Sequence, residues 1–300
     1  MPIFYSRDRQ LIYYRKIGRG IPVLMLHGVG MDSRHWLPFI LPHIHRFQFY
    51  LPDFRGAGRS SHVPVNQADL FQNLTEDIDD LVTHLALKDF ILVGYSLGAS
   101  VALHWHQAGG FSEVLRYLHI DQSPCIANQV DWAHGLLGDR QASFLALLDD
   151  VLQQLHPFRH LHALSDLPDP VIRDITPKMA EVLSVAAGNP AVVTLLRQAA
   201  RVPRWFVGLL GEISLHNLQA YLASYAANPH DYRESLTRFA VPVTMFIGKQ
   251  SPLYGYEGQT FAASLIPHCQ VQVFEKSGHL PQADEPVRFA RALGRFLRNE

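Results

Sequence analysis

Residues 94–98 read Gly-Tyr-Ser-Leu-Gly, which places one serine between two glycines. The four residues before this pentapeptide are all apolar, and residues 99–103 have the composition of a helix start. A sharp turn from a strand into a helix strains the backbone of the serine and projects its hydroxyl. Gly94 and Gly98 would leave room where the strand and the helix crowd together. The pattern therefore predicts that Ser96 is a nucleophile at such a turn.

A serine hydroxyl is a weak nucleophile until a base removes its proton. Among the 17 histidines, His279 follows the last predicted strand and precedes the last predicted helix. This position puts it at the same sheet edge as Ser96, with the serine first and the histidine last in chain order. We therefore expect His279 to be the base.

Other histidines form three H-x-H pairs, at residues 43 and 45, 104 and 106, and 160 and 162. No cysteine or carboxylate cluster accompanies them, and residues i and i+2 of a helix point apart. We expect no metal site and no cofactor.

The elements that must position Ser96 and His279 alternate between strands and helices. Apolar runs and other strand-like segments predict strands at residues 11–17, 23–26, 47–51, 90–93, 117–120, 241–248 and 270–274. Helical spacing marks residues 75–87, with Thr75 as the expected N-cap, and also the segment after Ser96 and residues 259–266 and 286–297. Strands separated by helices predict an α/β fold with a mostly parallel central sheet and helices on both faces.

The alternation stops between residues 122 and 238. This stretch contains prolines and helix-forming runs, at residues 143–155, 178–187, 191–200 and 215–226, without a strand pattern. A helical insertion packs most simply over the carboxyl ends of the strands, where ligands of open α/β sheets bind. We predict an α/β core of residues 1–121 and 239–300 and a helical cap of residues 122–238.

The composition of the 300 residues excludes several classes of partner. A net charge of −1 gives no electrostatic basis for binding nucleic acid or an anionic membrane surface. The two cysteines are far apart, which argues against a disulfide scaffold and fits a reducing compartment. The first ten residues lack the apolar stretch of a signal peptide, and no apolar run approaches the roughly 20 residues of a membrane span. A cytoplasmic protein without a membrane span is the expectation.

The chain resembles the α/β-hydrolases over nearly its full length. Besides the serine turn, it has His-Gly at residues 27–28 after a predicted strand, with Trp36 downstream. Residues 53–60 read Asp-Phe-Arg-Gly-Ala-Gly-Arg-Ser, a loop pattern common in that family. The resemblance is to the serine-nucleophile, esterase-like branch with a helical cap. It implies an oxyanion hole formed by the backbone N–H groups of Val29 and Leu97.

The acid departs from the pattern of the family. Members most often place it in a turn after the seventh strand, but this turn reads Gly-Lys-Gln-Ser-Pro, and Ser251 stands where the aspartate is expected. A hydroxyl does not stabilise imidazolium as a carboxylate does. Asp121 ends a predicted strand at the position from which some branches draw their acid, so the resemblance points to Asp121. Glu257, Asp284 and a Ser–His pair without an acid remain alternatives, although Asp284 is better placed to cap the last helix.

These residues predict a serine hydrolase that cleaves a carboxylic ester or related acyl bond of a small molecule through an acyl-enzyme. Thioester and carbon–carbon bond hydrolysis remain open, because they use the same groups. A second hypothesis is a cofactor-free dioxygenase of quinolone-like heterocycles, a class that shares this fold and uses a His–Asp pair. A third is a ligand-binding protein without catalytic activity.

Overall fold

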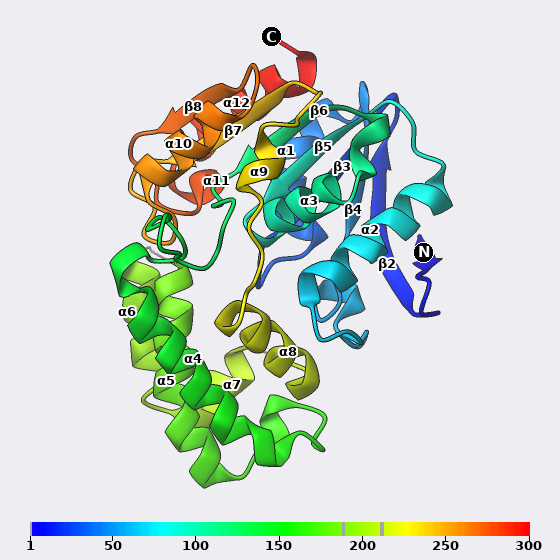
Figure 1. Cartoon of the computed structure of the whole chain (residues 1–300). Helices are drawn as coiled ribbons and strands as arrows, with labels where there is room; N and C mark the ends of the chain where they lie inside the picture. The colour runs from blue at the N-terminus through cyan, green and yellow to red at the C-terminus, as the bar shows by residue number, and fades with distance from the viewer. Residues whose placement is uncertain (1, 188–189, 211–212) are drawn as a thin grey trace.

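The computed structural model describes residues 2–187, 190–210 and 213–300. Eight strands form one sheet in the order β1-β2-β4-β3-β5-β6-β7-β8 (Figure 1). Their bounds are Ile3–Tyr5, Leu11–Gly18, Ile21–Leu26, Phe47–Pro52, Phe90–Tyr95, Val114–Ile120, Val243–Gly248 and Gln270–Phe274, for β1 to β8 in turn. Strand β2 pairs antiparallel with β1 and β4, and every neighbouring pair from β4 to β8 is parallel. The predicted α/β fold with a mostly parallel sheet is confirmed.

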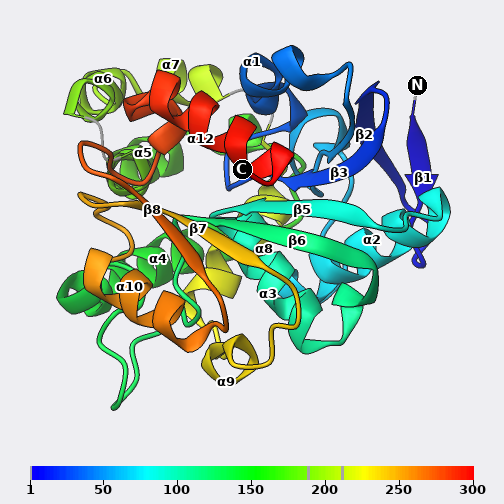
Figure 2. The same ribbon diagram turned by 90° about the horizontal axis from the view of Figure 1, so that it is seen from above.

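Alternate side chains of the strands bury an apolar layer on each face of the sheet. In β3, Leu24 and Leu26 belong to one layer, whereas Val23 and Met25 belong to the other. The first layer packs against α2 (Leu70–Leu85), α3 (Leu97–Gln107), α9 (Arg233–Leu236) and α10 (Tyr256–Leu265). The second packs against α1 (Leu37–Ile40) and α12 (Pro286–Arg298), which follows the short α11 (Pro281–Asp284). Figure 2 shows the two groups of helices on opposite sides of the sheet.

Helix α2 begins earlier than its apolar spacing predicts. Its N-cap is Asp69, whose side chain accepts a hydrogen bond of 2.9 Å from the backbone N–H of Phe71. The predicted N-cap at Thr75 is wrong, since Thr75 lies buried inside the helix. Asp69 satisfies an amide that has no partner within the helix, and residues 70–74 add a further turn that buries Leu74.

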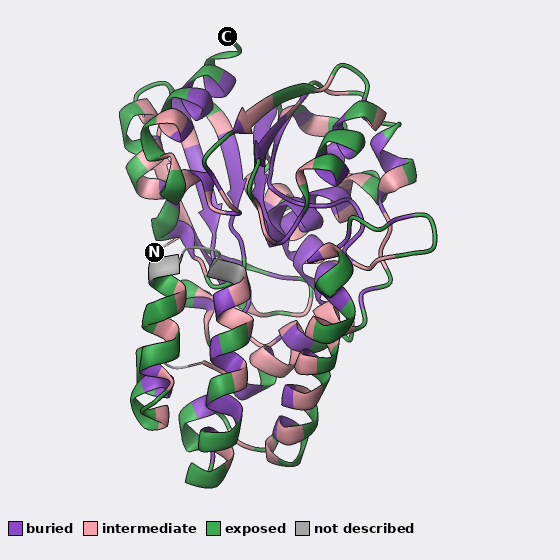
Figure 3. Cartoon of the chain, turned by 90° about the vertical axis from the view of Figure 1, so that its left-hand side faces the viewer, coloured by how far each residue is buried: buried purple, intermediate pink, exposed green. Residues whose placement is uncertain are grey.

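Five further helices lie between β6 and β7: α4 (Gln141–Leu155), α5 (Asp169–Ala187), α6 (Pro190–Ala199), α7 (Pro203–Leu210) and α8 (Leu215–Ala226). They form a layer below the sheet in Figure 1 and enclose an apolar core of their own. The outer faces of these helices are exposed, whereas the central strands β3 to β7 are mostly buried (Figure 3). Residues 188–189 and 211–212 of the predicted cap lie outside the described residues, and the described part of 122–238 contains no strand. The division into core and cap stays a prediction.

Hydrogen bonds from helix α8 join this helical layer to the loop that follows β4. The buried side chain of Asn217 accepts a hydrogen bond from the N–H of Val65 at 2.9 Å and donates one to the carbonyl of Val63 at 3.0 Å. One turn later, the hydroxyl of Tyr221 donates to the carbonyl of Arg55 at 2.8 Å. The side-chain amide of Asn217 therefore hydrogen-bonds to the loop backbone as a neighbouring strand would. Without it, the N–H of Val65 and the carbonyl of Val63 would be buried without a hydrogen-bond partner.

Candidate active site

The predicted nucleophile stands on a turn between β5 and α3. Ser96 has φ 51° and ψ −118°, a conformation that L-residues rarely adopt and that costs on the order of 1–3 kcal/mol. The turn is tight because its glycines have no side chains. A Cβ on Gly94 would lie 2.8 Å from Cα of Ala99, and one on Gly98 would overlap the carbonyl oxygen of Leu26. The local sequence thus forces the chain to reverse at the serine.

Ser96, His279 and Asp121 form one continuous chain of hydrogen bonds. Nδ1 of His279 lies 2.7 Å from Oδ2 of Asp121, and Nε2 lies 2.9 Å from Oγ of Ser96. Because an ionised carboxylate only accepts, Nδ1 carries the proton and Nε2 is free to accept from the serine hydroxyl. All three side chains are buried, with exposed fractions of 8 % for Ser96, 5 % for His279 and 0 % for Asp121. The arrangement can move the hydroxyl proton to the imidazole.

Asp121 follows the carboxyl end of β6, the strand beside β5. Its backbone also has a positive φ of 43°, and its N–H donates to the carbonyl of Phe246 in β7 at 2.9 Å. This turn directs the carboxylate back along the sheet edge toward His279, 158 residues later in the chain. The structure therefore brings together the three residues that the sequence singled out.

The loop that carries His279 is fixed from both sides. The hydroxyl of Tyr95 donates to the carbonyl of His279 at 3.1 Å, and the N–H of Gly278 donates to Oδ2 of Asp284 at 2.9 Å. The expectation that Asp284 caps the last helix is wrong, because the N-cap of α12 is Glu285, which makes no capping bond through its side chain. Neither Asp284 nor the exposed Glu257 has a hydrogen bond to the imidazole. Asp284 instead orients the backbone immediately before the histidine.

Two backbone N–H groups, those of Leu97 and Val29, have no hydrogen-bond partner among the described residues. Leu97 is the first residue of α3, so its N–H has no carbonyl partner within the helix. The N–H of Val29 lies in the loop after β3 and donates to no described group. Gly28 carries this loop close to the serine, since a Cβ there would lie 3.2 Å from Cβ of Ser96. Free amides of this kind are suited to binding a developing oxyanion.

A family model described as "Alpha/beta hydrolase family" matches residues 23–292. The chain belongs to the α/β-hydrolase family. One relative is the pimeloyl-[acyl-carrier protein] methyl ester esterase of Aliivibrio salmonicida, which is 23% identical over 293 residues, 96% of this chain and 97% of the relative.

Solved structures of this family share the fold of the chain. The esterase EaEST from Exiguobacterium antarcticum has a TM-score of 0.75 and 22% identity, with 99% of this chain and 98% of the esterase covered. A bromoperoxidase from Bacillus anthracis has a TM-score of 0.71 and 20% identity, with 99% of each chain covered. The family and its esterase-named members make this chain a hydrolase, and the resemblance inferred from the sequence is confirmed.

In this α/β hydrolase, His27 fixes the loop that carries the amide of Val29. The N–H of Phe54 donates to Nε2 of His27 at 3.0 Å, so Nε2 has no proton and Nδ1 must carry it. Nδ1 then donates to the carbonyl of Gly28 at 2.8 Å. This carbonyl and the N–H of Val29 belong to the same peptide group, so the hydrogen bond also fixes the direction of that N–H. Burial lowers the pKa of His27 and keeps the ring in this neutral state.

The Asp-x-Arg-Gly loop of the hydrolase is held by ion pairs of the buried Arg55 outside the site. Arg55 is 1 % exposed and pairs with both Asp8 and Asp77 at 2.7 Å. The guanidinium holds the pKa of Asp8 well below its usual range. Asp53 accepts hydrogen bonds from the N–H groups of Ser33 and Arg59. These contacts shape the loop on which α8 rests.

Sequence reasoning missed two side chains that contact Asp121. The hydroxyl of Ser251 lies 2.7 Å from Oδ2, and Nε2 of Gln259 lies 3.1 Å from Oδ1. Both residues are more than 120 positions away in the chain, and the sequence carries no signal for Gln259. For Ser251 the signal is its place in the turn after β7, where the family most often has its acid.

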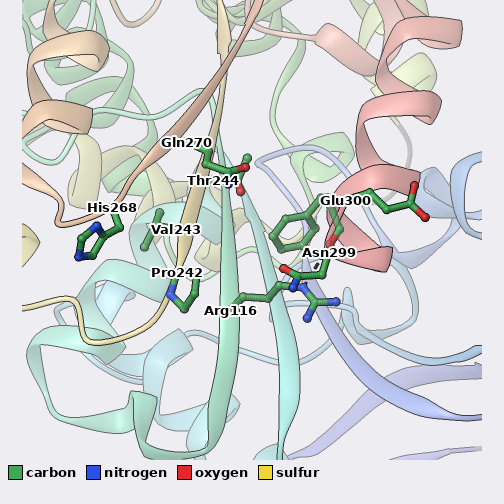
Figure 4. A pocket seen from close by; sticks show the side chains of 9 residues that line it. Arg116, Pro242, Val243, Thr244, His268, Gln270, Asn299 and Glu300 are labelled. Atoms are coloured by element: carbon green, nitrogen blue, oxygen red, sulfur yellow. Dashed lines mark hydrogen bonds between the residues drawn. The ribbon is translucent and has the colours of Figure 1, made fainter.

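The hydrolase also has a pocket at the amino ends of the strands, whereas Ser96 follows the carboxyl end of β5. Figure 4 shows the side chains that line this pocket. Its lining comes from the amino ends of β7 and β8 and from the last residues of the chain. There Arg116 donates hydrogen bonds to the carbonyls of Phe296 and Leu297 at the end of α12, a favourable place for a cation. None of the predicted site residues lines it.

Among the described residues, none of the H-x-H pairs belongs to a group of three or more side chains that could hold a metal ion. In the same part of the chain, no helix is both long and apolar enough to cross a membrane.

Proposed function

We propose that this hydrolase cleaves carboxylic esters, with Ser96 as the nucleophile, His279 as the base and Asp121 as the acid. The observation that carries the proposal is the unbroken hydrogen-bond chain from Oγ of Ser96 through His279 to Oδ2 of Asp121. A serine so connected gains a proton acceptor at the moment of attack, which an isolated hydroxyl lacks.

In the first half-reaction, Oγ of Ser96 attacks the ester carbonyl carbon as its proton passes to Nε2 of His279. The carbonyl oxygen becomes an oxyanion, and the N–H groups of Val29 and Leu97 stabilise it, each by about 3 kcal/mol. The ester C–O bond then breaks, and His279 returns the proton to the departing alcohol. An acyl-enzyme on Ser96 remains.

In the second half-reaction, water replaces the alcohol. His279 removes a proton from water, the resulting hydroxide attacks the acyl carbon, and Oγ of Ser96 leaves with the proton that His279 carried. Asp121 keeps the imidazole in the tautomer that accepts at Nε2 and stabilises the imidazolium formed in each half-reaction.

The helical layer of α4 to α8 is proposed as a cap over the site, with the predicted limits 122 and 238. Support comes from the separate apolar core of these helices and from their attachment through α8 to the loop after β4. The relative from Aliivibrio salmonicida is named for a methyl ester carried on an acyl-carrier protein, which supports a carboxylic ester as the bond that is cleaved.

A fluorophosphonate probe tests the nucleophile, because it phosphonylates only an activated serine. We expect the probe to label the wild-type protein at neutral pH and not the Ser96→Ala variant, and p-nitrophenyl esters of graded acyl length to be hydrolysed. Absence of labelling together with oxygen consumption on a quinolone-like heterocycle would favour the dioxygenase. Absence of both would leave a ligand-binding protein.

A further inference from the structure

Ser251 occupies the place in the turn after β7 where the family most often has its acid, and the structure gives this serine a partner. Its Oγ lies 2.7 Å from Oδ2 of Asp121. Since an ionised carboxylate only accepts, the serine hydroxyl must donate. Oδ2 is also the oxygen that accepts from Nδ1 of His279 at 2.7 Å. One carboxylate oxygen therefore receives two hydrogen bonds, one from the imidazole and one from Ser251.

The other carboxylate oxygen is held as well. Oδ1 of Asp121 accepts from the N–H of Gly248 at 2.8 Å and from Nε2 of Gln259 at 3.1 Å. Asp121 has an exposed fraction of 0 %, so water does not supply these bonds. Four donors from β7, the turn after it, α10 and the histidine loop thus fill the acceptor sites of a buried carboxylate, which is costly to bury unpaired.

The hydroxyl of Ser251 is itself oriented. The N–H of Ser251 donates to the carbonyl of Gly248 at 3.1 Å, which closes the turn, and the N–H of Tyr254 approaches Oγ at 3.5 Å. With the amide of Tyr254 on its acceptor side, the proton of the hydroxyl is directed at Asp121. The turn after β7 therefore supplies a hydrogen-bond donor to a carboxylate that comes from β6.

We propose that Ser251 is the positioning residue of the catalytic acid: its hydroxyl holds Oδ2 of Asp121 against Nδ1 of His279. The proposal rests on the proposed function, in which Asp121 orients the base. Ser251 touches neither the substrate nor the reacting atoms and acts through Asp121. Without this hydroxyl, the carboxylate keeps its hydrogen bonds to Gly248 and Gln259 through Oδ1, but Oδ2 can move. The imidazole is then less well aligned for each proton transfer.

The test compares Ser251→Ala and Ser251→Thr with a matched control, Ser235→Ala. Ser235 is a buried serine that also donates a hydrogen bond, to the carbonyl of Tyr232 at 2.8 Å, but it lies on α9 and makes no contact with Asp121. For each variant, kcat and KM on a p-nitrophenyl ester, the melting temperature and the low-field proton NMR resonance of His279 Nδ1–H are measured. The NMR resonance reports the His–Asp hydrogen bond without requiring turnover.

We expect Ser251→Ala to lower kcat about tenfold with KM changed less than twofold, and to shift or broaden the Nδ1–H resonance. Threonine keeps the hydroxyl, so Ser251→Thr should restore most of kcat and the wild-type resonance. Ser235→Ala should change the melting temperature by a similar amount but leave kcat and the resonance unchanged.

The inference is overturned if Ser251→Ala keeps the wild-type kcat and resonance, or if Ser235→Ala loses as much kcat. Failure of the proposed function has a different signature, namely no labelling of wild-type Ser96 by a fluorophosphonate. In that case an altered Nδ1–H resonance in Ser251→Ala still supports the positioning role, and an unaltered one refutes it.

Discussion

Ser96 and Asp121 share a backbone state that few residues other than glycine adopt. Their φ angles are 51° and 43°, and they directly follow the neighbouring strands β5 and β6. Each positive φ bends the chain at the sheet edge and turns the side chain toward His279. The strain, on the order of 1–3 kcal/mol per residue, is tolerated because the flanking strands and the hydrogen bonds of each side chain determine the conformation.

At this scale the role of Asp121 is open to a direct test. We predict that Asp121→Asn lowers kcat by roughly four orders of magnitude, because an amide at this position favours the wrong imidazole tautomer and cannot stabilise imidazolium. Steady-state hydrolysis of a p-nitrophenyl ester measures the loss.

Glu257→Gln serves as the control, since Glu257 is exposed on α10 and should leave kcat unchanged. Retention of most activity in Asp121→Asn, or a large loss in Glu257→Gln, would show that a residue other than Asp121 is the acid.

The sequence pointed to the residues that act through local patterns and missed those that act across the chain. Ser96 is predictable because a strand, a glycine-flanked serine and a helix follow one another within a few residues. The contact of Ser251 with Asp121 joins positions 130 residues apart, and Asp284 reaches back to Gly278 only because α11 folds against the histidine loop. Such contacts depend on tertiary packing, which local spacing does not encode.

At the scale of elements, the turn between β5 and α3 depends on the absence of side chains. A Cβ on Gly98 would overlap the carbonyl oxygen of Leu26 in the adjacent strand, so the start of α3 can rest on β3 only when residue 98 is glycine. The helix thereby brings its unpaired amides to the edge of the sheet beside Ser96.

We predict that Gly98→Ala destabilises the fold by about 1–3 kcal/mol, the usual cost of overpacking a tight interior. Urea unfolding measures the change. The control is Gly208→Ala in α7, where nothing lies within 4 Å of the added Cβ, so stability should rise by a few tenths to about 1 kcal/mol. Equal effects of the two substitutions would contradict the crowding argument.

The limits of strands follow from the sequence more closely than helix starts do. The strand predicted at residues 270–274 coincides with β8, where valine and glutamine alternate, as is typical of a strand. Helix α5 starts at Asp169, nine residues before the predicted start at residue 178, and continues through Pro177. A proline inside a helix removes one hydrogen bond, but burial of apolar side chains such as Ile172 and Ile175 among the helices α4 to α8 outweighs this loss.

At the scale of the whole molecule, polar contacts join α8 to the loop after β4, and Asn217 makes two of the buried ones. We predict that Asn217→Ala leaves the N–H of Val65 and the carbonyl of Val63 unpaired and weakens docking of α8 by about 1–3 kcal/mol. Hydrogen exchange should accelerate in α8 and in the loop at residues 61–66.

Gln219→Ala is the matched control, because Gln219 bonds within α8 to the carbonyl of Leu215. It should leave exchange in the loop unchanged. Equal exchange in wild type and Asn217→Ala would show that apolar packing alone holds α8 in place.

Buried neutral histidines make the stability of the molecule depend on pH. Burial lowers the pKa of His119 and of His106 to about 4, compared with about 6.5 in an unfolded chain. Between these values the unfolded state binds more protons, so each histidine reduces stability as the pH falls from about 6.5 toward 4. When the pH falls from 7 to 5, the melting temperature of His119→Gln should therefore fall with a shallower slope than that of the wild type.

A slope that is the same in His119→Gln and wild type would show that His119 does not titrate differently on folding.

The hydrogen-bond chain of the site has a consequence for how the molecule is assembled. It joins Ser96 to His279 across 183 residues and His279 to Asp121 across 158. Between β6 and β7 the chain must pass through the whole helical layer before the sheet can add its last two strands. Contacts of such high sequence separation form slowly. Recovery of esterase activity during refolding should therefore follow the slowest phase, later than the recovery of helical signal, and so report completion of the sheet.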